Sequence, residues 1–125
     1  MNVKKNSRIT VLVITVAMIV MASTPVQATK VKGKLTWSLS KPKAKTECDI
    51  GGIVQASIFA YDKKSNLVDS KVSSAKAQSV SAKATKKGAS AKGYYCVMNT
   101  NYTLLASFKS PIRSKGKDYS GSKSF

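Results

Sequence analysis

The chain has 125 residues, of which 22 are lysine or arginine and five are acidic, so its formal net charge is +17. It contains no histidine, which removes the commonest general base, the usual partner of a serine or cysteine nucleophile, and the commonest metal ligand. The sequence therefore argues against most enzyme classes, and we expect no catalytic centre, no metal site and no cofactor.

The first 28 residues have the pattern of a secretory signal peptide. Three basic residues precede an uncharged apolar run at 9–22, and small side chains follow at Val26 and Ala28. The run of 14 residues is shorter than the roughly 20 that a membrane-spanning helix needs. We therefore predict cleavage between Ala28 and Thr29, as in a secreted bacterial protein, with the mature chain either free outside the cell or attached to the cell wall.

The two cysteines, Cys48 and Cys96, both follow the predicted cleavage site. The remaining 97 residues suffice for one domain with a modest core, and an oxidising exterior favours disulfide formation. A bridge that closes a loop of 47 intervening residues stabilises by roughly 4 kcal/mol in the chain-entropy model. We predict an intramolecular disulfide between Cys48 and Cys96 rather than a catalytic or metal-binding thiol.

Alternation of apolar and polar residues dominates the chain after residue 29 and predicts strands. The clearest case is 31–40. The lysine-rich run 41–45 is predicted to end that strand, because Pro42 cannot donate to a sheet ladder. A second strand is expected at 50–61, with apolar residues on both faces as in a central strand, and with a bulge or close backbone approach at Gly51 and Gly52.

A polar hairpin turn is expected at 62–66, followed by an extended stretch at 67–72. The stretch 73–92 is open to two interpretations. Its alanine and lysine content favours a helix, whereas the alternation of small and polar residues at 80–85 favours strands. We prefer two short strands to a helix in this stretch.

Two further strands are predicted at 93–98 and 102–108, joined by a turn at 99–101. The domain is expected to span 29–110, with 111–125 as a C-terminal tail or a short edge strand. About six to seven short strands separated by turns predict an all-β fold, a small antiparallel sandwich or barrel.

After the cleavage site the chain carries 19 basic and five acidic residues, a net charge of +14. All but one of these basic residues are lysines, whose compact charge favours diffuse attraction to a polymer over sequence-specific reading of nucleic acid. A field of this strength concentrates polyanions at the protein surface. We expect an anionic polymer to contact Lys32, Lys34, Lys41, Lys43, Lys45, Lys83, Lys86, Lys87 and Lys92.

Tyr94 and Tyr95 are the candidates for an exposed aromatic side chain. Neighbouring residues on a strand face opposite sides of the sheet, so one of the two is expected to reach solvent. The nearest pair of acids, Glu47 and Asp49, stands among lysines and is expected to form a local salt-bridged patch rather than a pair of catalytic carboxylates.

The sequence predicts a secreted, cationic, non-enzymatic protein that binds anionic polymers of the cell envelope or the extracellular space. The alternative is an antimicrobial, bacteriocin-like or toxin-like protein, which positive charge would bring to an anionic membrane and whose apolar face would then perturb the bilayer. We expect neither sequence-specific nucleic acid nor a small-molecule substrate as a partner.

Overall fold

The computed structural model describes residues 29–125, and the predicted signal peptide with Ala28 lies outside the described residues. This part of the chain is all-β, with nine antiparallel strands in two sheets and no helix. The all-β antiparallel prediction is confirmed, with nine strands instead of six to seven. The strands are β1 (Lys30–Ser38), β2 (Lys41–Glu47), β3 (Ile53–Tyr61), β4 (Leu67–Lys76), β5 (Ser79–Lys83), β6 (Ser90–Met98), β7 (Leu104–Lys109), β8 (Arg113–Ser114) and β9 (Tyr119–Ser124).

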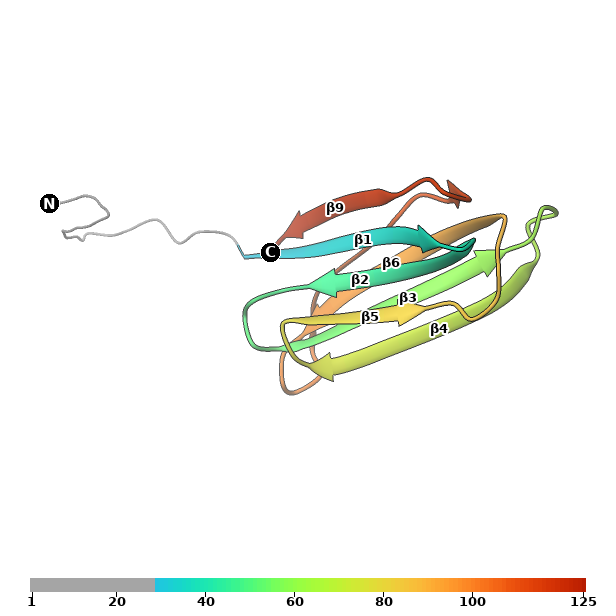
Figure 1. The fold of residues 1–125 in the computed structure, drawn as a ribbon. Coiled ribbons are helices and arrows are strands. Elements are labelled where there is room, and N and C mark those ends of the chain that lie inside the picture. The colour runs from blue at the N-terminus through green and yellow to red at the C-terminus, as the bar shows by residue number, and fades with distance from the viewer. Residues whose placement is uncertain (1–28) are drawn as a thin grey trace, which may run out of the picture.

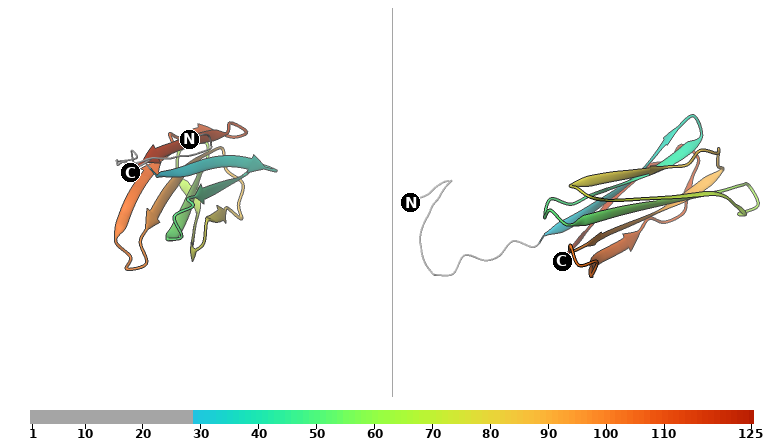
Figure 2. Two further views of the ribbon diagram at one scale, coloured as in Figure 1. Left: turned by 90° about the vertical axis from the view of Figure 1, so that its left-hand side faces the viewer. Right: turned by 90° about the horizontal axis from the view of Figure 1, so that it is seen from below.

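The two sheets face each other as the layers of a sandwich (Figures 1 and 2). One has the strand order β5-β2-β1-β9, and the other has the order β4-β3-β6-β7, with β8 paired to the start of β6. Within residues 29–125 we find no helix long and apolar enough to cross a membrane. The core lies between the layers, where the alternate residues of each strand meet.

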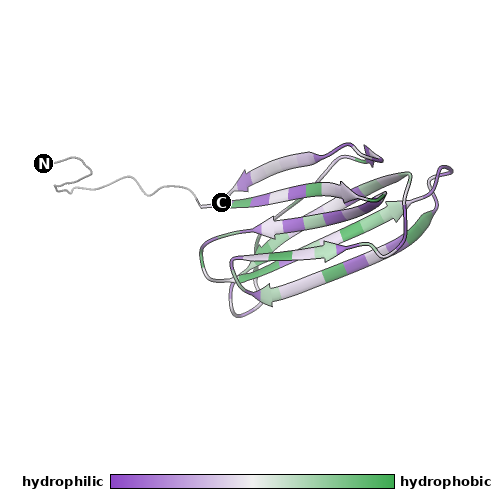
Figure 3. Ribbon diagram, in the orientation of Figure 1, coloured by the Kyte–Doolittle hydropathy of each residue, from purple (hydrophilic) through white to green (hydrophobic). Residues whose placement is uncertain are grey.

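The apolar residues that alternate with polar ones in β1 and β3 lie in the core, as the sequence predicts. Val31 and Leu35 of β1 are fully buried, as are Val54 and Ile58 of β3. Hydrophobic and hydrophilic segments accordingly alternate along β1 (Figure 3). β3 lies between β4 and β6, which confirms the prediction of a central strand.

The first strand ends before the lysine-rich run, as predicted, since β1 ends at Ser38, but Pro42 is not the cause, because it is the second residue of β2. Its carbonyl accepts a hydrogen bond from the Ala84 backbone amide at 2.9 Å. In a β-strand, the nitrogen and the carbonyl of one residue point to the same side of the strand. The nitrogen of Pro42, which carries no hydrogen, therefore points to the end of β5 and not to β1. No hydrogen bond to β1 is lost, and the strand continues.

The structure also tests two other local predictions. Gly51 and Gly52 belong to the turn between β2 and β3, where Gly51 has a φ of 75°, so they form no bulge. The alternative, a close backbone approach, is confirmed at Gly52, because a Cβ atom there would fall on the backbone carbonyl oxygen of Met98. Tyr102 lies before β7 with a φ of 63°, and the pairing of β6 with β7 shifts register between Val97 and Met98. This strand therefore begins at Leu104, two residues later than predicted.

The two stretches left open by the sequence are both extended. Residues 73–92 contain the end of β4, the whole of β5 and the start of β6, so the strand interpretation is correct and the helix is not formed. Residues 119–124 form β9, an edge strand paired with β1. The sheet therefore extends beyond residue 110, the domain boundary that the sequence predicts.

A tyrosine packs closely against two glycines between the layers. Tyr95 of β6 is fully buried, and its ring lies directly against Gly33 of β1 and Gly93 of its own strand. The ring centroid is 5.0 Å from that of Phe108 and 6.4 Å from that of Tyr119. Because neither glycine has a side chain, the flat ring fits between the two backbones.

A carboxylate of β4 holds the loop after β5. Oδ2 of Asp69 accepts hydrogen bonds from the backbone amides of Thr85 at 2.7 Å and Lys86 at 3.1 Å. Desolvation acts to raise the pKa of Asp69, but these amides and the Thr85 hydroxyl outweigh it, so the pKa lies below 3.8. The loop is thus tied to the ionised form of Asp69.

Acid should weaken this attachment. Since the folded pKa of Asp69 is lower than the unfolded one, its contribution to stability is complete above pH 3.8 and is lost as the pH falls through the folded pKa. We expect the urea midpoint, followed by the fluorescence of Trp37, to fall below a pH of about 4. Asp69→Asn should reduce this pH dependence, and an unchanged profile in that variant would contradict the role assigned to the carboxylate.

Candidate polyanion interface

Seven lysines gather on the outward side of the sheet β5-β2-β1-β9. The inward residues of β1 and β2 are buried, so the alternate residues point to solvent. Every outward residue of the four strands is a lysine, serine, threonine or glutamate, and Glu47 is the one acidic residue that these strands contain. We call this surface the lysine face, and its lysines are Lys30, Lys32, Lys34, Lys41, Lys43, Lys45 and Lys83.

The strand register places lysines directly opposite one another. Lys34 of β1 pairs with Lys45 of β2, and Lys43 of β2 pairs with Lys83 of β5. Like charges in directly opposite positions destabilise a sheet. The lysine face therefore has two directly opposed lysine pairs, and in one of them Lys45 is also ion-paired with Glu47.

Hydroxyl groups border the lysines on both sides. On the β9 side, Lys34 pairs with Ser120 and Lys32 pairs with Ser122. On the β5 side, Lys45 pairs with Ser81. A hydroxyl donates one hydrogen bond, so these serines supply donors beside the ammonium groups.

The lysines around Glu47 lower its pKa. Lys45 lies 3.0 Å from the Glu47 carboxylate and forms an ion pair with it. The hydrogen bond from Lys45 lowers the pKa of Glu47; desolvation opposes this shift, and the charges of Lys45, Lys34 and Lys32 add to it. Lysines of both strands thus act on one carboxylate, as their shared face requires.

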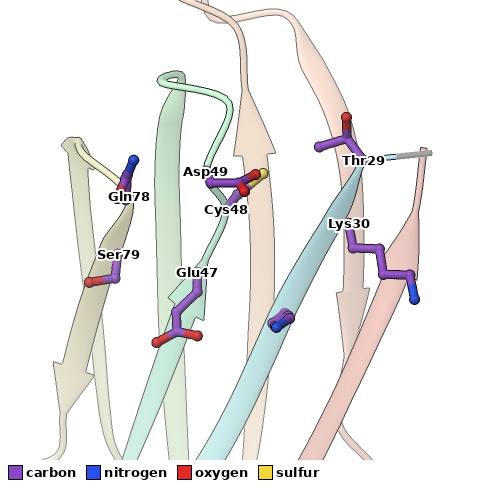
Figure 4. Close-up of a pocket in the computed structure, with 8 residues that line it drawn as sticks. Thr29, Lys30, Glu47, Cys48, Asp49, Gln78 and Ser79 are labelled. Carbon is purple, nitrogen blue, oxygen red and sulfur yellow. The ribbon is translucent and has the colours of Figure 1, made fainter. Parts of the chain in front are cut away.

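Two hollows adjoin the lysine face. The larger, of about 650 Å³, lies where β1 begins and β2 ends, and Figure 4 shows the side chains around it. The smaller, of about 420 Å³, lies over β1 and β9 and shares Lys32 and Glu47 with the first. Both are lined by charged and hydroxyl side chains, with Cys48, Gln78 and Gly121 as the exceptions. They make the face uneven but form no apolar ligand cavity.

The structure brings together six of the nine lysines that the sequence analysis selected. These are Lys32, Lys34, Lys41, Lys43, Lys45 and Lys83 on the lysine face. Lys86 and Lys87 lie in the exposed loop between β5 and β6, and Lys92 lies on β6 in the other sheet. Lys30 was missed, although it continues the alternation of Lys32 and Lys34. The bordering serines were also missed, because their position depends on the pairing of distant strands.

The structure does not contain the predicted disulfide, because Cys48 and Cys96 are both buried free thiols. Cys48 packs in the core with Val54 and Val97. Cys96 lies between Tyr95 and Val97, whose side chains face the core, so its own side chain faces the outer side of that sheet. The two sulfurs are therefore directed to opposite sides of the β6 layer.

Thiol labelling tests this arrangement. Cys48 and Cys96 are each 4% exposed, and burial raises the pKa of Cys96. We therefore expect almost no reaction of the native protein with a thiol-specific reagent at neutral pH, and two thiols per chain after unfolding in urea. Finding no thiol in the unfolded protein would show that the disulfide forms after all.

Tyr94 and Tyr95 point to opposite sides of β6, as neighbouring residues of a strand must. Tyr94 is 39% exposed, whereas Tyr95 is fully buried and is no candidate for contact with a partner. Tyr94 lies on the outer side of the second sheet, in the same strand as Lys92. The exposed aromatic and the lysine face are therefore on opposite layers of the sandwich.

The acids of this region do not form a metal centre. Glu47 and Asp49 both line the larger hollow, with Cys48 between them, but residues 29–125 contain no group of three or more Cys, Asp and Glu side chains able to hold a metal ion. The ion pair of Glu47 with Lys45 agrees with a salt-bridged patch.

No family model matches the chain, and searches of curated proteins and of solved structures found no match.

Proposed function

We propose that the protein is exported and binds anionic polymers of the cell envelope or the extracellular space through the lysine face, without catalysing a reaction. One observation carries this proposal: seven lysines and a single carboxylate occupy the outward side of one sheet. Gathering the charge on one side gives the electrostatic field a direction, so a polyanion is drawn to that side and held by several lysines together.

The placement of apolar residues favours a polymer over a membrane as the partner. A protein that perturbs a bilayer needs positive charge and an apolar surface on the same side. Here the outward positions of the lysine face are all polar, whereas Val72 and Tyr94, two of the exposed large side chains, lie on the other sheet. The antimicrobial alternative is therefore the weaker of the two.

Two variants of equal charge test the proposal. The first replaces Lys34, Lys43 and Lys83 of the lysine face by glutamine. The control replaces three exposed lysines in turns by glutamine, namely Lys63, Lys64 and Lys115. We expect the first variant to elute from an immobilised phosphate-bearing polymer at clearly lower salt than the control. Its plot of log affinity against log salt concentration should have a slope smaller by roughly two to three, because three fewer lysines displace counterions.

The other results would count against the proposal. Equal losses in the two variants would mean that net charge and not the lysine face governs binding. Binding that does not change with salt would exclude an electrostatic interface of exposed lysines. Release of dye from anionic vesicles by micromolar protein would instead support the membrane-active alternative.

A further inference from the structure

The lysines of β1 and β2 form one continuous line along the sheet. Lys30, Lys32 and Lys34 occupy successive outward positions of β1, and Lys34 is opposite Lys45. From that pair the line continues on β2, where Lys43 is opposite Thr36 and Lys41 is opposite Ser38. We call each set of outward residues that lie directly opposite one another on neighbouring strands a level. Five successive levels each carry at least one lysine of β1 or β2. We call this line the lysine track, formed by Lys30, Lys32, Lys34, Lys45, Lys43 and Lys41.

The spacing of the track follows from the geometry of a strand. Alternate residues of a strand are separated by six backbone bonds and by about 6.7 Å. An extended chain of any chemistry advances by a similar length over six single bonds, which is about 7 Å by the same geometry. A polymer that carries one negative charge for every six backbone bonds would therefore keep in step with the lysines over the whole track.

We propose that the lysine track binds an extended linear phosphodiester polymer with a six-bond repeat, which lies along β1 and β2 with one phosphate at each level. A three-carbon polyol phosphate chain has this repeat. The inference rests on the proposed function and specifies the chemistry of the polymer. It depends on the regular spacing of the lysines along the track, whereas the proposed function requires only that many lysines lie on one side of the molecule.

The groups around the track suit phosphate. Lysine binds phosphate as a point charge, and neighbouring hydroxyls donate to the remaining oxygens. Ser81 and Ser120 border the Lys45–Lys34 level. Ser122 borders Lys32 on the β9 side, and Glu47 is opposite Lys32 on the β2 side. A phosphate at the Lys45–Lys34 level competes with the Glu47 carboxylate for Lys45 and neutralises Lys34, which lies directly opposite.

The lysine face favours a phosphodiester without bases. Binding of single-stranded nucleic acid uses aromatic side chains for stacking, and reading of base edges uses arginine. The outward positions of β1, β2, β5 and β9 contain neither type of residue. Nucleic acid shares the six-bond backbone, so a separate arm of the experiment distinguishes it from a polyol phosphate.

Synthetic oligomers of matched charge test the register. One series joins phosphates by three-carbon diols, with six bonds from phosphorus to phosphorus, and the other joins them by six-carbon diols, with nine. We expect affinity in the three-carbon series to rise about fivefold for each added phosphate, as for a lysine near an anionic surface, and to level off beyond five phosphates. The six-carbon oligomer of five phosphates should bind at least tenfold more weakly, because it meets fewer levels of the track.

A variant in the middle of the track provides the control. Lys34→Gln should weaken binding of the five-phosphate, three-carbon oligomer about fivefold, whereas Lys64→Gln in the turn after β3 should leave it unchanged. Equal binding of the two series at equal charge would overturn the proposed register and leave polyanion binding intact. Tighter binding of an oligonucleotide of the same phosphate number would contradict a base-free ligand. Failure of every oligomer and polymer to bind would overturn both proposals.

Discussion

Replacing Tyr95 by alanine should lower the free energy of unfolding by about 3–5 kcal/mol, the range found when a large buried aromatic ring is deleted. Tyr95 is fully buried and contacts both layers, through Gly33 of β1 and Phe108 of β7. Its removal opens a cavity between the sheets that glycine cannot fill. Urea unfolding, followed by the fluorescence of Trp37, should show a much lower midpoint for this variant, because a small domain has only about 5–15 kcal/mol of stability.

Tyr95→Phe is the matched control, and we expect the opposite sign. The Tyr95 hydroxyl has no hydrogen-bond partner among residues 29–125. Ser110 lies nearby, but its Oγ makes no hydrogen bond with the Tyr95 hydroxyl; it accepts from the Gly93 amide and donates to the Pro111 carbonyl, each at 2.8 Å. Because a buried hydroxyl without a partner is unfavourable, its loss should raise stability by about 1 kcal/mol. Strong destabilisation by phenylalanine would show that the hydroxyl is bonded and that the ring is not the main contribution.

The second large effect concerns Gly33. A Cβ atom at this position would fall on the ring of Tyr95, which Gly93 confines from the other side. Replacement of glycine by alanine ordinarily stabilises a protein slightly, because it restricts the unfolded chain. Gly33→Ala should instead destabilise by about 1–3 kcal/mol, the cost of overpacking a core, and urea unfolding would measure the change.

A double-mutant cycle assigns the Gly33 effect to the ring. In a Tyr95→Leu background the smaller side chain leaves room, so the cost of Gly33→Ala should fall to near zero. The same cost in both backgrounds would mean that alanine disturbs β1 by another route, such as its pairing with Gly121 of β9.

Most of the architecture could be predicted from the sequence, because it depends on a local signal. The alternation of Val31 and Leu35 with lysines fixes which side of β1 is buried, and the same pattern defines β3. The double tyrosine of β6 likewise divides into one buried and one exposed residue. In each case a period of two is sufficient, since successive strand residues face opposite sides.

The incorrect predictions concern residues whose surroundings depend on the pairing of strands that are distant in the sequence. Pro42 continues a strand because of the side to which its nitrogen points, and that depends on where β5 lies. Cys48 and Cys96 suggested a disulfide by their number and by the expected compartment, but the layers direct their side chains apart. Neither the sheet order nor the position of a side chain relative to the other layer can be read from local sequence.

The candidate interface was predicted in part for the same reason. The lysines of β1 and β2 share a face by simple alternation, and Lys83 joins them only because β5 pairs with β2. Lys92 was assigned with them by its charge, although β6 belongs to the opposite layer. The serines of β9 come from a segment that the sequence left open as a tail or an edge strand.

The opposed pairs Lys34–Lys45 and Lys43–Lys83 have a consequence for the thermodynamics of binding. In the absence of a polymer, small anions from the solution must gather over this side of the molecule to offset the repulsion. A polyanion that takes their place sets these ions free, and the polymer's own condensed cations are released at the same time. Association would then be driven chiefly by the entropy of the liberated ions, with little heat exchanged.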